Sequence, residues 1–270
     1  MSVIRRPRRG MVEEENSYWM SFSDIMSSLL ILFILAAVAL MVQLMTKQDE
    51  LGSALAEVDR QIEQQELQQS AFDEQIGRIG SAEQVRSDVL TEVQRELESA
   101  GIEVVLNQDS SVLSIPSSAL GFDSGAYEIA PAYRERATLI GQVLSDVLRD
   151  GDRIASLDTV FIEGHTDAVP FTGPLGMDNW GLSTFRAISL WQLWDTALPA
   201  KHQLDTLKNA DGKALFSVSG YAHTRPADGA PKGPEDYAPS RRIDIRITIV
   251  RPSSDELQGI SEKLTAETSK

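Results

Sequence analysis

The sequence predicts an α+β protein, in which a single membrane-spanning helix and a helical linker precede a β-α-β-α-β-β domain with a mixed sheet. Three observations support this fold class. An uninterrupted apolar run covers Leu29–Val42, and a polar stretch without proline covers residues 46–99. Over residues 100–251 the hydrophobic pattern changes repeatedly between the periods of helices and strands.

Composition limits the functions that this chain can have. Of its 270 residues 40 are acidic and 25 are basic, so the net charge is −15. Because nucleic-acid binding needs a clustered positive surface, we expect no nucleic-acid partner. The chain has no cysteine. This excludes disulfides, thiolate metal sites and a cysteine nucleophile, and we also expect no lipid anchor on a cysteine.

The N-terminal segment has the charge pattern of a single-pass membrane protein. Residues 20–45 contain Ile25–Leu44, which matches the roughly 20 apolar residues that cross a bilayer. A basic cluster precedes this segment at Arg5, Arg6, Arg8 and Arg9. Lys47 is the only nearby positive charge after it. The positive-inside rule therefore predicts a cytoplasmic tail at residues 1–19 and places the rest of the chain across the membrane.

A cleaved signal peptide is the alternative interpretation of this segment. The basic start fits it, and the Ala-Val-Ala sequence at residues 37–39 resembles a cleavage site. Against it, Asp24 and four serines lie where a signal peptide is apolar. The balance favours a retained membrane helix.

Residues 46–99 predict a helical or coiled-coil linker. Apolar residues recur at spacings of four, three and four at Leu51, Leu55, Val58 and Ile62. This heptad-like pattern makes pairing with a second copy plausible, although the apolar stripe is thin. Gly77 and Gly80 interrupt the pattern, and Ser81 with Gln84 resembles a capping box that restarts a helix.

The segment from residue 100 to residue 251 predicts the α+β domain. The expected strands are 102–106, 112–115, 157–163, 215–219 and 242–250, and the expected helices are 132–148 and 182–198. We expect both helices to pack on one face of a mixed sheet. Residues 252–270 are expected to form a flexible polar tail.

Asp24 stands out in the membrane segment. Ser21, Ser27 and Ser28 lie three or four residues from it and share its helix face, whereas the other faces are apolar. A charged residue at the centre of a span costs about 2.5–3.5 kcal/mol, and such residues commonly serve ion passage. The alternative is an interfacial position just outside the hydrocarbon. One helix cannot form a channel, so other chains must supply the rest of an ion pathway.

The second informative region follows the strand that is predicted to end at Glu163. It reads Gly-His-Thr-Asp at 164–167, and the next helix, capped by Asn179 or Ser183, carries Arg186 in its first turns. We therefore expect Asp167 and Arg186 to meet in one crevice. Such a pair suits a zwitterionic ligand, because the guanidinium can hold a carboxylate and Asp167 an ammonium. An internal salt bridge is the alternative.

Catalysis is not expected. His165 and Asp167 are potential metal ligands, but the chain has three histidines and neither an HExxH motif nor a paired-carboxylate site. His165 is better explained as a structural hydrogen-bonding residue. Ser183 has no recognisable general-base partner that would make it a nucleophile. We predict neither an enzyme nor a bound cofactor.

Residues 110–250 resemble the peptidoglycan-binding domains of the OmpA and MotB families. The shared motifs are the LGFDSG stretch, GHTD at 164–167, and the N-x-x-L-S-x-x-R-A pattern, followed by Gly220-Tyr221, Pro226 and Arg241-Arg242. Ser240 stands where the family usually has Asn. The resemblance implies that the domain binds the diaminopimelate of the stem peptide without cleaving it. Asp167 and Arg186 would hold the zwitterion, and the residues that would shape the pocket are Thr166, Asn179, Leu182 and Arg242.

The segment YWMSFSDIMSSLL at residues 18–30 resembles the membrane helix of the B subunits of ion-driven stator motors. The resemblance implies a bacterial inner-membrane protein with a periplasmic C-terminal domain. Asp24 would carry a proton or sodium ion, and Ser21, Ser27 and Ser28 would line the channel. The implied assembly is a homodimer with a MotA/ZorA-like membrane subunit.

Two kinds of motor share this design: the flagellar stators of the MotB and PomB type, and the Zorya anti-phage system with its ZorB subunit. The acidic 47–70 region lacks the recognisable plug of flagellar stators, although residues 46–99 could still hold a plug. We therefore favour a Zorya-type motor, with a flagellar stator and a passive wall tether as alternatives.

Overall fold

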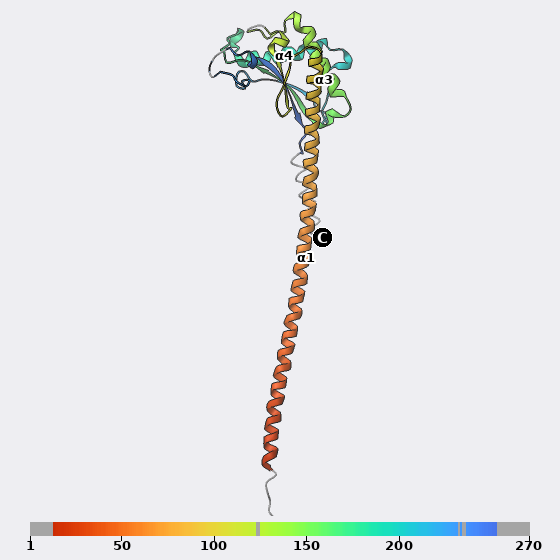
Figure 1. Ribbon diagram of the computed structural model, residues 1–270, viewed down its shortest axis with the longest axis vertical. Coiled ribbons are helices and arrows are strands. Elements are labelled where there is room, and N and C mark those ends of the chain that lie inside the picture. The colour runs from red at the N-terminus through yellow and green to blue at the C-terminus, as the bar shows by residue number, and fades with distance from the viewer. Residues whose placement is uncertain (1–12, 123–124, 232, 234–235, 253–270) are drawn as a thin grey trace, which may run out of the picture. The chain divides into compact units, whose positions relative to one another are not determined.

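The computed structural model describes residues 13–122, 125–231, 233 and 236–252 (Figure 1). Its helices are α1 (Glu13–Ser99), α2 (Ser117–Leu120), α3 (Arg134–Arg149) and α4 (Asn179–Ala197). Its strands are β1 (Val105–Leu106), β2 (Val112–Pro116), β3 (Leu157–His165), β4 (Phe216–Gly220) and β5 (Arg242–Ile249). Most of both predicted tails, residues 1–12 and 253–270, lies outside the described residues.

The N-terminal part of α1 is long and apolar enough to cross a membrane. Its large apolar side chains are exposed, as Leu30 at 60 % and Phe33 at 70 % illustrate. A helix suits such a segment, because it satisfies its backbone hydrogen bonds internally when lipid surrounds it. The helix expected from residues 20–45 is therefore present.

α1 continues without a break through Gly77 and Gly80. The sequence predicted an interruption there and a capping box at Ser81, and that prediction is wrong. Ser81 Oγ donates to the Gly77 carbonyl at 2.9 Å, so it bonds backward within the helix instead of capping a new one. A glycine inside a helix costs only about 1 kcal/mol relative to alanine, which is too little to end a long helix.

The chain divides into two compact units, and the division falls within α1, between Gln69 and Ser70. In the second unit the last turns of α1 join the hydrophobic core through Val89, Leu90, Val93 and Leu97. Glu92 adds an ion pair with Arg153 at 2.8 Å. The predicted domain begins at residue 100. The core begins earlier because these apolar residues share one helix face.

The end of α1 also explains why β1 is shorter than the predicted strand 102–106. Gly101 has a positive φ of 75°, a conformation that favours glycine and commonly ends helices. Ile102 N then donates to the Leu97 carbonyl at 2.9 Å. Ile102 thus closes the helix, and the strand begins only at Val105.

The five strands form one mixed sheet in the order β1-β2-β5-β3-β4. β3 and β4 are parallel, and the other neighbouring pairs are antiparallel. The register aligns Gly164 with Gly220 and His165 with Arg242. The C-terminal ends of β3 and β4 therefore meet the start of β5 at one edge. The α+β class and the mixed sheet agree with the prediction.

The two faces of the sheet differ in polarity. Along β5 the buried core residues Ile243, Ile245, Ile247 and Ile249 alternate with Arg242, Asp244, Arg246 and Thr248 on the other face. α4 contacts β3, β4 and α3. Trp194 of α4 donates Nε1–H to the Ala137 carbonyl of α3 at 2.7 Å. Gly141 makes room for it, because a Cβ there would lie 2.6 Å from the indole.

Candidate functional site

The end of β3 and the start of α4 meet closely, as the sequence predicted. Gly164 allows this approach, because a Cβ at that position would lie 1.9 Å from the Ser183 carbonyl oxygen. After the strand, Thr166 N donates to the Ala222 carbonyl at 2.8 Å. These contacts hold Thr166 and Asp167 beside the first turns of α4.

Asp178 caps α4, so the prediction of Asn179 or Ser183 as the cap is wrong. Asp178 Oδ1 accepts hydrogen bonds from the backbone of Trp180 at 2.9 Å and of Gly181 at 3.2 Å. Asn179 Nδ2 donates instead to the Val169 carbonyl at 2.9 Å and braces the loop. Ser183 Oγ accepts from Ala222 N at 3.0 Å, which ties α4 to the segment after β4.

A cavity of about 360 Å³ lies at this edge. We call it the main cavity. Five of the six predicted peptidoglycan-binding residues line it: Thr166, Asp167, Asn179, Leu182 and Arg186. The structure adds Phe122, Asp236 and Arg241 to the same lining.

Arg186 is the most deeply buried charge in the lining, with 2 % of its surface exposed. Its Nε donates to the Ala126 carbonyl at 2.8 Å, and its guanidinium carbon lies 5.3 Å from the centre of the Phe122 ring. Burial lowers the pKa of Arg186 to about 10, and the charge of Arg241 adds to this, whereas Asp167 opposes it. A guanidinium that has lost this much hydration gains from contact with an anion.

Asp167 forms its ion pair with Arg241, whereas the sequence predicted a pair with Arg186. Asp167 Oδ2 accepts from Arg241 Nη1 at 2.6 Å, and Arg241 also pairs with Asp236. Burial alone would lower the pKa of Arg241, but the hydrogen bonds to Asp167 and Asp236 outweigh it and raise the pKa. Arg186 is still close enough for the charge of Asp167 to affect its pKa.

Sequence reasoning missed Arg241 as a site residue and chose Arg242. β5 is antiparallel to β3, and Arg242 lies opposite His165, so the preceding residue lies beside Thr166 and Asp167. Adjacent residues of an extended chain point to opposite sides, so Arg241 reaches the main cavity and Arg242 does not. Only the register of β5 against β3 could have identified Arg241 as a site residue.

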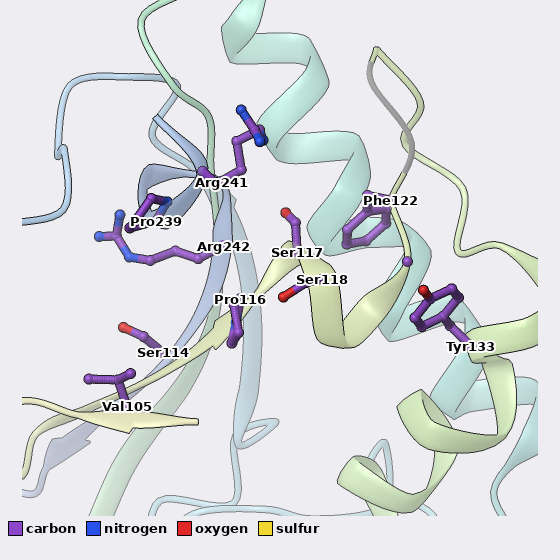
Figure 2. A pocket seen from close by; sticks show the side chains of 12 residues that line it. Val105, Ser114, Pro116, Ser117, Ser118, Phe122, Tyr133, Pro239, Arg241 and Arg242 are labelled. Atoms are coloured by element: carbon purple, nitrogen blue, oxygen red, sulfur yellow. The ribbon is translucent and has the colours of Figure 1, made fainter. Parts of the chain in front are cut away.

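Arg242 therefore lines a neighbouring groove instead of the main cavity (Figure 2). Its Nε donates to Asp244 Oδ1 at 2.9 Å, and its Nη1 donates to the Arg225 carbonyl at 3.2 Å. Burial would raise the pKa of Asp244, but the hydrogen bond from His165 and the charge of Arg242 lower it.

His165 belongs to the same polar network. Its Nε2 lies 3.1 Å from Asp244 Oδ2, its ring stacks on Tyr221 with centres 5.6 Å apart, and its side chain is 1 % exposed. These contacts support a structural role for His165. In the part of the chain that the structure describes, no group of three or more His, Asp or Glu side chains is placed to hold a metal ion.

The second predicted site lies on α1. Asp24 is exposed, as are Ser21, Ser27 and Ser28, and helical spacing brings these three serines to its side. Ser28 Oγ donates to the Asp24 carbonyl at 2.8 Å, which leaves the carboxylate without that contact. Ion binding at this polar stripe stays a prediction.

No family model and no curated protein matches this chain. Solved structures do resemble it. A putative MotB-like protein from Desulfovibrio vulgaris is 20 % identical over 67 % of this chain and 98 % of its own, with a TM-score of 0.44. The periplasmic domain of Helicobacter pylori MotB (residues 78–256) is 17 % identical over 61 % and 92 %, with a TM-score of 0.42. The cell wall anchor of the T6SS from Pseudomonas aeruginosa is 19 % identical over 60 % and 97 %, with a TM-score of 0.40.

Proposed function

We propose that the main cavity binds the zwitterionic end of diaminopimelate in the peptidoglycan stem peptide and so anchors the chain to the cell wall. The observation that carries this proposal is the meeting of buried Arg186 with the Asp167–Arg241 pair in one cavity. A guanidinium holds a carboxylate in a bidentate fashion, and a carboxylate holds an ammonium. Both halves of an amino-acid zwitterion therefore have a partner.

Burial supports the same assignment. Arg186 is 2 % exposed, so a ligand carboxylate can contact it with little water to displace. The Thr166 hydroxyl is buried and has no hydrogen-bond partner among the described residues. Such hydroxyls usually have a partner, and a polar ligand would supply one.

Binding of free ligands by the full chain in detergent tests this proposal. Calorimetry should detect meso-diaminopimelate, whereas Nα-acetyl-L-lysine, which has no carboxylate beside its free ammonium, should bind more weakly. Arg186→Gln should lower the affinity for diaminopimelate about tenfold or more, the usual worth of a charge-assisted hydrogen bond. Arg95→Gln is the matched control, because Arg95 lies on α1 with 70 % of its side chain exposed. Equal binding of the two ligands, or full affinity in Arg186→Gln, would contradict the proposal.

Binding without cleavage is part of the same proposal. Incubating the chain with purified peptidoglycan should give co-sedimentation without soluble fragments. Release of fragments would instead assign the chain to the wall-degrading enzymes.

We further propose that the chain is the B subunit of an ion-driven inner-membrane motor. Asp24 would bind the transported proton or sodium ion between a homodimer and a MotA/ZorA-like subunit, with Ser21, Ser27 and Ser28 along the path. The cost of about 2.5–3.5 kcal/mol for a charge in a span supports a functional role. Asp24→Asn should abolish ion-dependent activity and leave wall binding intact, whereas Asp49→Asn, beyond the apolar run, should change neither. Full activity of Asp24→Asn would reduce the chain to a passive tether.

For the biological output we favour Zorya-type anti-phage defence over flagellar rotation. The support is the sequence of residues 47–70, which lacks a flagellar plug pattern. Deleting the gene should lower resistance to phage in plating assays and leave swimming unchanged, and a motility defect would favour the flagellar alternative. If residues 47–70 still regulate ion flow, their deletion should cause ion leakage in cells.

A further inference from the structure

A groove of about 500 Å³ adjoins the main cavity, and the two share Phe122 and Arg241 in their linings. The groove is built by β1, β2, α2 and the residues that lead into β5 (Figure 2). A ligand that leaves the main cavity past Arg241 and Phe122 therefore enters this groove.

The middle of the groove carries free hydroxyl groups. Ser117 and Ser118 lie there between Arg242 on one side and Phe122 with Tyr133 on the other (Figure 2). Within the described ranges, the hydroxyls of Ser117 and Ser118 have no hydrogen-bond partner. They are available to the amide groups of a bound peptide.

Arg242 is held rigidly at one end of the groove. Its Nε bonds to Asp244, and its Nη1 bonds to the Arg225 carbonyl. Asp244 is itself fixed by Ser114 Oγ at 2.7 Å and by His165. Nη2 of Arg242 has no partner in the described part of the chain. This preorganised donor suits a carboxylate, because its rotamer is fixed before the ligand arrives.

We propose that the groove binds the next part of the same stem peptide, with a second carboxylate at Arg242 and its amide groups at Ser117 and Ser118. This inference rests on the proposed binding of diaminopimelate in the main cavity. In the stem peptide the residue before diaminopimelate is a γ-linked glutamate, which carries a free α-carboxylate. Apolar side chains such as Val105 and Pro116 would contact the peptide between its polar groups.

Three ligands separate the groove from the main cavity: free meso-diaminopimelate, the tripeptide L-Ala-γ-D-Glu-meso-diaminopimelate, and the same tripeptide with the glutamate carboxylate amidated. The full chain should bind the tripeptide about tenfold more tightly than free diaminopimelate, and amidation should remove most of this gain. Equal affinity for all three ligands would overturn the groove assignment alone. Failure to bind diaminopimelate in any form would overturn the proposed function with it.

Charge variants at Val105 give an independent test that avoids the buried Asp244 network. Val105 lines the groove and is 64 % exposed, so substitution there does not threaten folding. Val105→Glu should weaken tripeptide binding up to about fivefold and Val105→Lys should strengthen it, as exposed charge pairs allow. Val105→Gln is the neutral control, and free diaminopimelate should bind all three variants equally. If Val105→Glu and Val105→Lys bind the tripeptide with the same affinity, no ligand carboxylate lies in the groove.

Discussion

Leu90 tests whether the last turns of α1 belong to the core of the second compact unit. Its side chain is fully buried in the shared core, with 0 % exposed. Leu90→Ala removes most of that side chain and leaves a cavity, and such changes cost about 3–5 kcal/mol at sites that relax little. Alanine is as good a helix former as leucine, so helix propensity does not add to the loss. For a unit of this size each kcal/mol lowers Tm by about 2–4 °C, so we expect a drop of about 6–20 °C.

Thermal unfolding of the full chain in detergent, followed by near-ultraviolet circular dichroism, measures this loss. Leu67→Ala is the control on the same helix, because Leu67 is 44 % exposed and lies in the other compact unit. It should change stability by less than about 0.5 kcal/mol. A domain that folds independently from residue 100 would unfold at the same temperature in both variants, and this result would refute the assignment.

Three further predictions concern the site and its support. Gly164→Ala would place a Cβ 1.9 Å from the Ser183 carbonyl, so we expect a loss of about 1–3 kcal/mol in thermal unfolding and weaker diaminopimelate binding in calorimetry. Asp178→Ala removes the cap of α4 and should cost about 1 kcal/mol by the same unfolding measurement. Burial opposes ionisation of Asp244, but the hydrogen bond from His165 helps to lower its pKa in the folded state. The ionised Asp244 therefore stabilises the fold above about pH 4, and this stabilisation is lost as the pH falls through the folded pKa. Asp244→Asn should make the free energy of unfolding, measured by denaturant titration, depend less on pH.

Local patterns predicted the fold and most of the site. The isoleucines at 243, 245, 247 and 249 alternate as a half-buried strand must, and this pattern identified β5 directly. The Gly-His-Thr-Asp sequence placed Asp167 at a strand end, and the start of the next helix placed Arg186 opposite it. Leu182 came from the resemblance to the OmpA and MotB families. These residues came together because each depends on a short stretch of chain with one clear period.

The errors arose where the answer depends on distant partners. Placing Arg241 at the main cavity needs the register of β5 against β3, which no local pattern contains. Peptidoglycan binding by Arg242 stays a prediction. The place of Leu90 in the core depends on partners far along the chain. Asp178 was missed as the cap because glycine and proline around it indicated only a loop.

The continuity of α1 bears on the choice between a motor subunit and a passive tether. A tether needs only reach, and a flexible linker supplies it at little cost, because the entropy of a loop grows slowly with its length. A stator must hold its position against a turning load. A flexible linker would stretch under that load and let the stator move. In this chain one helix runs from Glu13 to Ser99, carries Asp24, and ends with Leu90, Val93 and Leu97 in the core of the second unit. Force on the proposed wall site would therefore reach α1 through buried apolar contacts, which yield less than exposed ones. A firm hold on the last turns of α1 fits the proposed motor subunit better than a passive tether, and full activity of Asp24→Asn would contradict that proposal.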